Sequence, residues 1–153
     1  MPLTGEYEPS SAQWVRDQVE AYERSGGAEA NTLRDTGLPI IVVTTRGNRT
    51  GKLRKIGLMR VTHDGKYALI GSQGGAPTDP VWVHNLRADP DAVTIQDGPE
   101  PLDATVREVE GGERATWWDR GVAAYPPYAD YQKRTDRRIP VFVATPRGRQ
   151  HTG

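Results

Sequence analysis

The chain has 153 residues, and its 20 Lys+Arg balance its 20 Asp+Glu, so the formal net charge is zero. This length suits a single domain with a real core, and the charge balance argues against bulk nucleic-acid binding. There is no cysteine, which excludes disulfides, thiolate nucleophiles and cysteine metal sites, and the three histidines are spread along the chain. No apolar run approaches the ~20 residues of a membrane span, and the polar N-terminus lacks a signal-peptide core. We therefore expect a cytoplasmic protein without a metal site.

The N-terminal part of the chain predicts an amphipathic helix over residues 11–24. Ser10 or Ser11 can cap it, and four apolar side chains fall at helical spacing on one face: Trp14, Val15, Val19 and Tyr22. We expect this stripe to pack the helix onto the domain. The alternative is a helix that lies on a membrane surface, although its polar face is mixed in charge rather than basic.

Short β-branched or alternating runs follow, separated by Gly, Pro and Asp-Gly turns. They predict six strands, over residues 38–45, 53–63, 66–72, 92–96, 102–109 and 139–145. Further helices are expected over residues 79–87 and 112–124. In the first of these, Thr78 or Asp79 can provide the N-cap and Pro80 suits the first turn.

The order of these elements predicts an α+β fold. Successive hairpins favour antiparallel pairing, and about six strands with peripheral helices indicate a small closed or split β-barrel. A doubly wound parallel sheet is disfavoured because strands and helices do not alternate regularly. We divide the chain into a helical extension (residues 1–30), a barrel domain (residues 31–147) and a polar tail (residues 148–153).

The loop between the first two strands is strongly basic. Within ten positions it holds Arg46, Arg49, Lys52, Arg54 and Lys55. Such side chains bind phosphate and carboxylate groups, although the spacing does not fit a Walker phosphate loop. In a neutral chain this density of positive charge favours a polyanionic small molecule as ligand; the alternative is a solvated hairpin loop.

The run from Ser72 to Leu86 predicts a strand end, a glycine turn and a helix start. Gly74 and Gly75 let a backbone approach a ligand closely, and the free N–H groups at a helix start attract anions. Many such units bind nothing. We give this one weight because it is expected at the same end of the sheet as the basic loop.

A tyrosine-rich segment precedes the last strand. Tyr125, Tyr128 and Tyr131 are three residues apart, so on a helical turn they would share a face and could stack on a planar substrate. The alternative is ordinary core packing. No nucleophile pattern accompanies His84, which disfavours hydrolysis. A polyanion loop, a glycine turn and an aromatic segment together indicate a bound cofactor that brings its own reactivity.

Three groups of residues between positions 41 and 146 also form family motifs. They are Thr44-Thr45 with Gly47-Asn-Arg-Thr-Gly51 and Arg54, Ser72-Gln-Gly-Gly-Ala76 with Pro80-Val-Trp-Val-His-Asn-Leu86, and Tyr125-Pro-Pro-Tyr-Ala-Asp-Tyr131 with Thr135-Asp-Arg137 and Ile139-Pro-Val141. Together they resemble the deazaflavin-dependent nitroreductases, the F420H2-dependent quinone and nitro reductases of actinobacteria. The resemblance implies a split β-barrel of the FMN-binding type and coenzyme F420 as the cofactor.

The resemblance also implies site residues. Those around the phosphate and acidic tail of the cofactor would be Asn48, Arg49, Thr50, Arg54 and Lys55. Those around its ring would be Ile56, Gly57, Leu58, Met59, Ile70, Gly71, Ser72, Gln73, Val81, Trp82 and Asn85. The substrate pocket would be formed by Tyr125, Tyr128 and Tyr131, with Tyr128 and Ser72 near the reacting groups. Asn48 and Gln73 stand where family members often carry basic residues.

The working hypothesis is a two-electron reductase. Reduced F420 would give its C5 hydride to an electrophilic acceptor such as a quinone, a nitroaromatic or an activated enone, while the protein orients the reactants and stabilises negative charge. Two alternatives are an FMN-dependent oxidoreductase on the same barrel and a protein that binds a cofactor or small ligand without turnover. A small-molecule substrate, a homodimer and peripheral membrane contact through the N-terminal helix are the expected partners.

Overall fold

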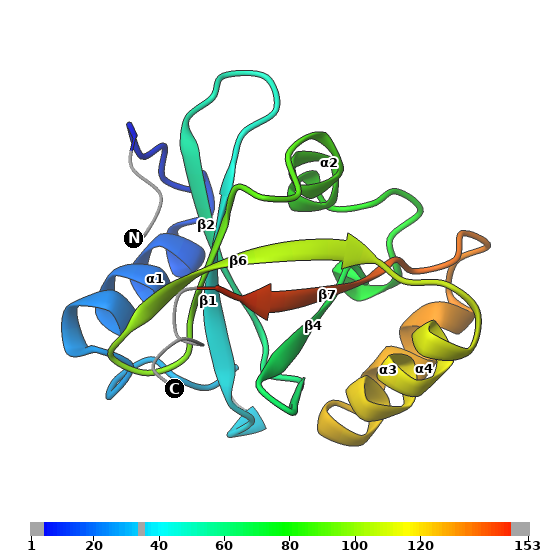
Figure 1. The fold of residues 1–153 in the computed structure, drawn as a ribbon. Helices are drawn as coiled ribbons and strands as arrows, with labels where there is room; N and C mark the ends of the chain where they lie inside the picture. The colour runs from blue at the N-terminus through cyan, green and yellow to red at the C-terminus, as the bar shows by residue number, and fades with distance from the viewer. Residues whose placement is uncertain (1–4, 34–35, 148–153) are drawn as a thin grey trace.

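The computed structural model describes residues 5–33 and 36–147, and its centre is a seven-stranded sheet (Figure 1). The strands are β1 (Ile40–Arg46), β2 (Leu53–Met59), β3 (Thr62–His63), β4 (Lys66–Ile70), β5 (Val93–Gln96), β6 (Pro101–Glu108) and β7 (Val141–Pro146). The helices are α1 (Gln13–Ser25), α2 (Val81–Ala88), α3 (Gly111–Ala124) and α4 (Pro127–Lys133), with a 3-10 turn η2 at Gln73–Gly75. Neighbouring strands pair antiparallel throughout the sheet, as the hairpin order predicts.

The strand order β2-β1-β5-β6-β7-β4-β3 places β2 and β3 at opposite edges of the sheet. Only Arg60 and Val61 connect these two strands, and consecutive Cα atoms are ~3.8 Å apart. The two edges must therefore lie close together, and the sheet curls into the α+β split β-barrel that the sequence predicts. The expected single strand over residues 53–63 is wrong, because the chain changes edges at this corner: the carbonyl of Val61 accepts a hydrogen bond from the N–H of Ala68 (2.8 Å).

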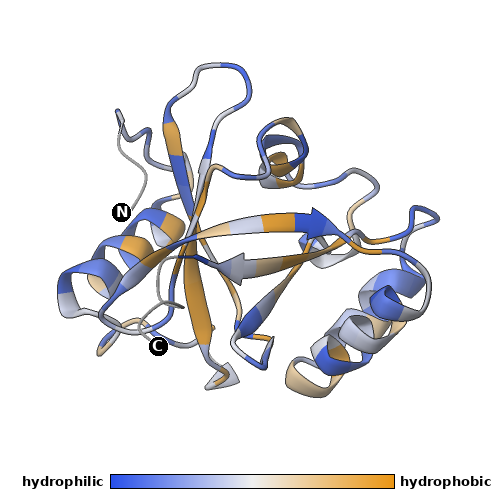
Figure 2. Ribbon diagram, in the orientation of Figure 1, coloured by the Kyte–Doolittle hydropathy of each residue, from blue (hydrophilic) through white to orange (hydrophobic). Residues whose placement is uncertain are grey.

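Side chains of β1, β4 and β7 alternate between two apolar clusters, because successive strand residues point to opposite faces. Ile40 and Val42 belong to a cluster that α1 and α3 cover, whereas Ile41 and Val43 belong to one that α2 covers. Figure 2 shows the hydrophobic colour concentrated along the strands and the hydrophilic colour on the β1–β2 loop, residues 47–52. This packing holds α2 beside that loop (Figure 1).

Both predicted helix caps are wrong. Helix α1 begins at Gln13 with Ala12 as its N-cap, and the Ser10 hydroxyl instead accepts the N–H of Ala12 (3.1 Å). Helix α2 begins at Val81 with Pro80 as its N-cap, and no side chain caps it. The carboxylate of Asp79 is engaged elsewhere, in ion pairs with two arginines, which are stronger partners than a neutral backbone N–H.

The tyrosine-rich segment is helical, since α4 contains two of its three tyrosines. Among residues 5–33 and 36–147, no helix is both long enough and apolar enough to cross a bilayer. The predicted polar tail, residues 148–153, lies outside the described residues.

Candidate functional site

Two adjoining cavities lie between the β1–β2 hairpin and helix α2. The apolar cavity has a volume of about 180 Å³ and is lined by Ser10, Val15, Thr45, Arg54, Lys55, Ile56, Gln73, Pro80, Val81, Trp82 and Asn85. The cationic cavity has a volume of about 330 Å³ and is lined by Glu8, Gly47, Asn48, Arg49, Thr50, Arg54, Val81, His84 and Asn85. They share three lining residues, so one elongated ligand can occupy both. Ten of the predicted cofactor residues line one or both cavities: Asn48, Arg49, Thr50, Arg54, Lys55, Ile56, Gln73, Val81, Trp82 and Asn85.

The buried Asn85 fixes α2 against the basic loop. Its side-chain oxygen accepts the N–H of Asn48 (3.0 Å), and its side-chain nitrogen donates to the Thr45 hydroxyl (3.1 Å). One turn earlier on the same helix, Val81 is 66% exposed although it is apolar, and it lines both cavities. An exposed apolar side chain at the junction of two cavities is suited to contact with a ligand.

The N-terminal segment reaches the basic strand β2 and adds to its edge. Leu53 donates its N–H to the carbonyl of Glu6 (2.7 Å) and accepts the N–H of Glu8 (2.9 Å), which forms a parallel bridge at Tyr7. This register brings acidic side chains against basic ones along β2. As a result, Glu8 lines the cationic cavity.

Three basic side chains of the loop and of β2 are already paired with carboxylates. Three ion pairs are Lys52–Glu6 (3.4 Å), Arg54–Glu8 (3.5 Å) and Lys55–Glu23 (2.6 Å). Arg49, at the tip of the loop, forms no ion pair with any residue in the described ranges. Within the described ranges, a polyanionic ligand would therefore meet the guanidinium of Arg49 without competition from a carboxylate, and would compete with carboxylates for Lys52, Arg54 and Lys55.

The turn between β4 and α2 forms the other wall. Ser72 is 7% exposed, and the next residue, Gln73, has a φ of +44°, which is uncommon outside glycine. Gly75, with a φ of +82°, lies so close to α4 that an added Cβ would be 2.7 Å from the carbonyl oxygen of Tyr131. The predicted close backbone approach at Gly75 is thus to the protein's own helix.

The three predicted substrate tyrosines cluster with one another. The ring centroids of Tyr125 and Tyr128 are 5.0 Å apart, and the hydroxyls of Tyr125 and Tyr131 are hydrogen-bonded at 2.8 Å. Tyr128 is 5% exposed within the first apolar cluster, and burial raises its pKa well above the usual range. These tyrosines do not line the apolar or the cationic cavity.

The structure separates several other predicted ring contacts from the cavities. Met59 and Ile70 are buried in the first apolar cluster, and Gly57 faces α1, where an added Cβ would be 3.1 Å from the side-chain oxygen of Gln18. Leu58 packs against the second cluster. Because strand residues alternate in direction, the run from residue 56 to 59 cannot line one wall in full.

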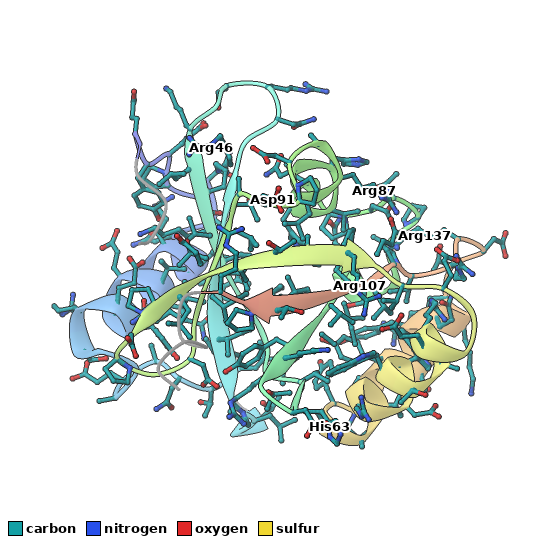
Figure 3. The ribbon with its side chains drawn as sticks, viewed as in Figure 1. Arg46, His63, Arg87, Asp91, Arg107 and Arg137 are labelled. Atoms are coloured by element: carbon teal, nitrogen blue, oxygen red, sulfur yellow. The ribbon has the colours of Figure 1, made fainter. Side chains whose placement is uncertain are left out.

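Sequence reasoning missed Glu8, Ser10, Val15 and His84 as cavity-lining residues. Glu8 and Ser10 belong to the N-terminal segment that pairs with β2, Val15 belongs to α1, and His84 belongs to α2. A usable signal was the complementary charge of Glu6-Tyr-Glu8 and Lys52-Leu-Arg54. Figure 3 shows His63 at the opposite end of the molecule from Arg46, so this histidine is remote from the basic loop.

A protein family and several known proteins are similar to this chain. A family model described as F420H(2)-dependent quinone reductase matches residues 14–146. An F420H(2)-dependent quinone reductase of Mycobacterium tuberculosis (strain H37Rv) is 34% identical over 112 residues, which cover 71% of this chain and 74% of the relative.

Two solved structures are similar to this chain. One, described as an F420-H2 dependent reductase (FDR-A), is 52% identical, covers 69% of this chain and 93% of its own, and gives a TM-score of 0.65. The other, described as a domain-swapped dimer, is 47% identical, covers 88% of this chain and 99% of its own, and gives a TM-score of 0.68.

The family model and the mycobacterial relative are described as quinone reductases, whereas the resemblance noted from the sequence also used the nitroreductase label. The family model extends over most of the chain, including α1 from Trp14 onward, the tyrosine cluster and all cavity-lining residues except Glu8 and Ser10. The chain therefore belongs to the F420H(2)-dependent quinone reductase family.

Proposed function

We propose that this chain is an F420H2-dependent oxidoreductase that transfers a hydride from reduced deazaflavin to an electrophilic acceptor of the quinone class. The observation that carries the proposal is the pair of adjoining cavities, one apolar and one cationic. An apolar cavity with a few polar groups suits a planar ring, and arginine and lysine suit a phosphate and carboxylate tail. Such a ligand is long and polyanionic at one end, as F420 is.

The turn at Ser72 supports this fit. The backbone N–H groups of Ser72 and Gln73 have no acceptor among the described residues, although Ser72 is buried. An unpaired buried donor costs about 1–3 kcal/mol, so such groups are rare in proteins that have no ligand for them. The first of these N–H groups belongs to a buried residue and the second to an exposed one. Both lie at the turn next to the apolar cavity that Gln73 lines, and together they suit an oxygen or an anionic nitrogen of a ring.

When bound, F420H2 would supply a hydride from C5, and a quinone that accepts this hydride together with one proton becomes a quinol. The chain's own part is binding and orientation. Ile56, Val81 and Trp82 would exclude water from the ring, and Arg49 and Arg54 would hold the anionic tail. Donors in a dry site stabilise negative charge as it develops on an acceptor.

Tyr128 and Ser72 are proposed near the reacting groups. The raised pKa of Tyr128 keeps its hydroxyl protonated at neutral pH, so it can donate a hydrogen bond but is a weak acid. Tyr128→Phe tests the role, measured as the rate with each acceptor at saturating cofactor. An unchanged rate with quinones, nitroaromatics and enones alike would show that Tyr128 has no role in the reaction and contributes only to core packing.

The first test is a fluorescence titration of the purified protein with F420 and, separately, with FMN. Saturable binding of F420 and not FMN is expected, followed by F420H2 oxidation when quinones are added. Nitroaromatics and enones in the same screen then define the acceptor class. Binding of FMN alone would be consistent with the split β-barrel fold but would contradict F420 as the cofactor. F420 binding without turnover of any acceptor would indicate a carrier.

We further propose a homodimer and a cytoplasmic location. The similar solved structure described as a domain-swapped dimer supports the homodimer, which sedimentation velocity tests.

Membrane contact through α1 is also a proposal: Trp14 is 47% exposed there. Trp14→Glu is the appropriate variant for liposome co-sedimentation, because deletion of residues 1–30 would also remove the buried Val19 and Tyr22 from the core.

A further inference from the structure

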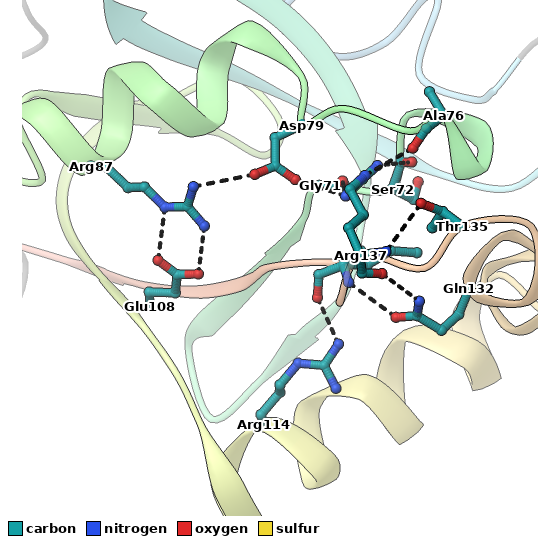
Figure 4. Close-up of polar contacts among 11 residues, drawn as sticks. Gly71, Ser72, Ala76, Asp79, Arg87, Glu108, Arg114, Gln132, Thr135 and Arg137 are labelled. Carbon is teal, nitrogen blue, oxygen red and sulfur yellow. Dashed lines mark hydrogen bonds and ion pairs between the residues drawn. The ribbon is translucent and has the colours of Figure 1, made fainter.

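Arg137 holds the turn at Ser72 in place through a set of contacts that no other described side chain duplicates (Figure 4). Its Nε donates to the carbonyl of Ala76 (2.8 Å), Nη1 to the carbonyl of Gly71 (3.1 Å), and Nη2 to the carbonyl of Ser72 (2.7 Å). Nη1 also pairs with the Oδ1 atom of Asp79 at 2.8 Å. The Arg137 and Asp79 side chains are only 14% and 17% exposed, so this guanidinium is largely buried, and it makes four hydrogen bonds with its five N–H donors.

These contacts fix the direction of two peptide units. Every peptide bond of the described chain is trans, and in a trans peptide the N–H points opposite to the C=O. Since the carbonyls of Gly71 and Ser72 point to Arg137, the N–H groups of Ser72 and Gln73 point away from it. These are the same two N–H groups that have no acceptor among the described residues.

The same guanidinium joins the turn to the start of α2. Asp79 precedes Pro80, Val81 and Trp82, which line the apolar cavity, and it also pairs with Arg87 at 3.2 Å. Arg87 in turn holds Glu108 on β6 at 2.8 Å. Two walls of the apolar cavity, the turn and the N-terminal end of α2, are therefore anchored on Arg137.

We propose that Arg137 is a positioning residue for the cofactor: it holds the Ser72 and Gln73 N–H groups, and the start of α2, in the arrangement that receives the deazaflavin ring. This inference rests on the proposed function for the identity of the ligand. A planar fork with several donors is required, because one side chain must reach three carbonyls and a carboxylate. Lysine, a point charge, can keep the pair with Asp79 but cannot satisfy all three carbonyls.

Arg137→Lys is the test variant and Arg138→Lys the matched control, because Arg138 is the neighbouring arginine, is exposed and pairs with Glu110. The readouts are Kd for F420 and the hydrogen-exchange rates of the Ser72 and Gln73 amides, with and without F420. In the wild type and in R138K, F420 should slow both amides. In R137K, Kd should rise about tenfold and that slowing should be lost at these two amides, whereas kcat for quinone should fall.

Asp79→Asn provides a second variant that leaves the three carbonyl contacts, and it should raise Kd by a smaller factor, about threefold. Unchanged Kd and unchanged amide protection in folded R137K would overturn the inference. So would a loss of stability in R137K and D79N with no change in Kd, which would make Arg137 only structural. If the wild type does not bind F420, the proposed function fails instead. The positioning claim is then decided in the ligand-free protein, where R137K but not R138K should shift the amide resonances of Ser72 and Gln73.

Discussion

The two ends of the site are built in opposite ways. At the cationic cavity, exposed side chains on a loop and on the N-terminal segment meet in ion pairs of 3.4 and 3.5 Å. At the apolar cavity, a largely buried arginine holds three carbonyls and a carboxylate at 2.7–3.1 Å. Exposed ion pairs contribute about 0–1 kcal/mol each and are weakened by salt, so they can be exchanged for a ligand's charges. A buried guanidinium network cannot be exchanged without leaving unpaired groups. On the proposed function, the chain would present an adaptable end to the anionic tail of F420 and a preorganised end to its ring.

The largest effect is expected from Gly75→Ala at the preorganised end. An added Cβ would lie 2.7 Å from the carbonyl oxygen of Tyr131, so the turn or α4 must move. Gly74→Ala is the control, because Gly74 also has a positive φ but has open space around it. Urea unfolding should show a loss of about 1 kcal/mol for G74A and several kcal/mol for G75A, with F420 affinity lost only in G75A. Equal effects of the two substitutions would mean that the turn is not tightly packed.

At the adaptable end, Arg49→Gln should weaken F420 binding without changing stability, because this side chain forms no ion pair with a described residue. We expect Kd to rise about fivefold at low salt, and the difference from wild type to shrink as salt is added. Arg107→Gln, on β6 and paired with Glu113, is the control for net charge. An R49Q protein that binds F420 as tightly as R107Q would exclude Arg49 from the tail site.

A smaller effect of opposite sign is expected from Glu8→Gln. Its carboxylate pairs with Arg54 at the edge of the cationic cavity, and its removal leaves that guanidinium to the ligand. Kd for F420 should fall about two- to threefold at low salt, and the gain should vanish at high salt. Glu29→Gln, on an exposed residue after α1, gives a matched change of charge. Weaker binding by E8Q would show that this carboxylate contacts the ligand favourably.

The smallest effect concerns the tyrosine cluster at high pH. Burial, and then the hydrogen bond with Tyr131, raise the pKa of Tyr125 to about 12, against 10.0 for the free side chain. Between these values the unfolded state releases a proton that the folded state keeps, so stability should fall as pH rises through this window. As pH rises through this window, the urea concentration at the unfolding midpoint should decline in the wild type, and it should decline less in Tyr125→Phe. An identical slope in both proteins would contradict the raised pKa.

Local patterns were sufficient to predict most of the elements and the basic loop beside the cavities, whereas the other expected site residues came from the family resemblance. The run Ile40-Ile-Val-Val43 and the spacing of Val19 and Tyr22 record their burial directly in the sequence, so the strand and the helix could be found. Basic residues clustered in a short loop likewise predicted the cationic cavity. These features depend on neighbours within a few positions.

Long-range contacts account for what was missed. The corner at Arg60 and Val61 is a property of sheet closure, since nothing local distinguishes it from a continuous strand. Asp79 looked like a helix cap because its partner Arg137 lies 58 positions away. Similarly, the tyrosines share a face as predicted, but the packing of α3 and α4 determines that they meet one another rather than line a cavity.

The pairing of residues 6–8 with β2 has a consequence for the solubility of shortened chains. Beyond Leu53, β2 is an edge strand, and its unpaired N–H and C=O groups are a template for another chain. Residues 6–8 occupy part of that edge. A truncation that removes them to expose the basic residues would also open the edge, and such a protein should self-associate through added β-strands at concentrations where the intact chain stays dispersed.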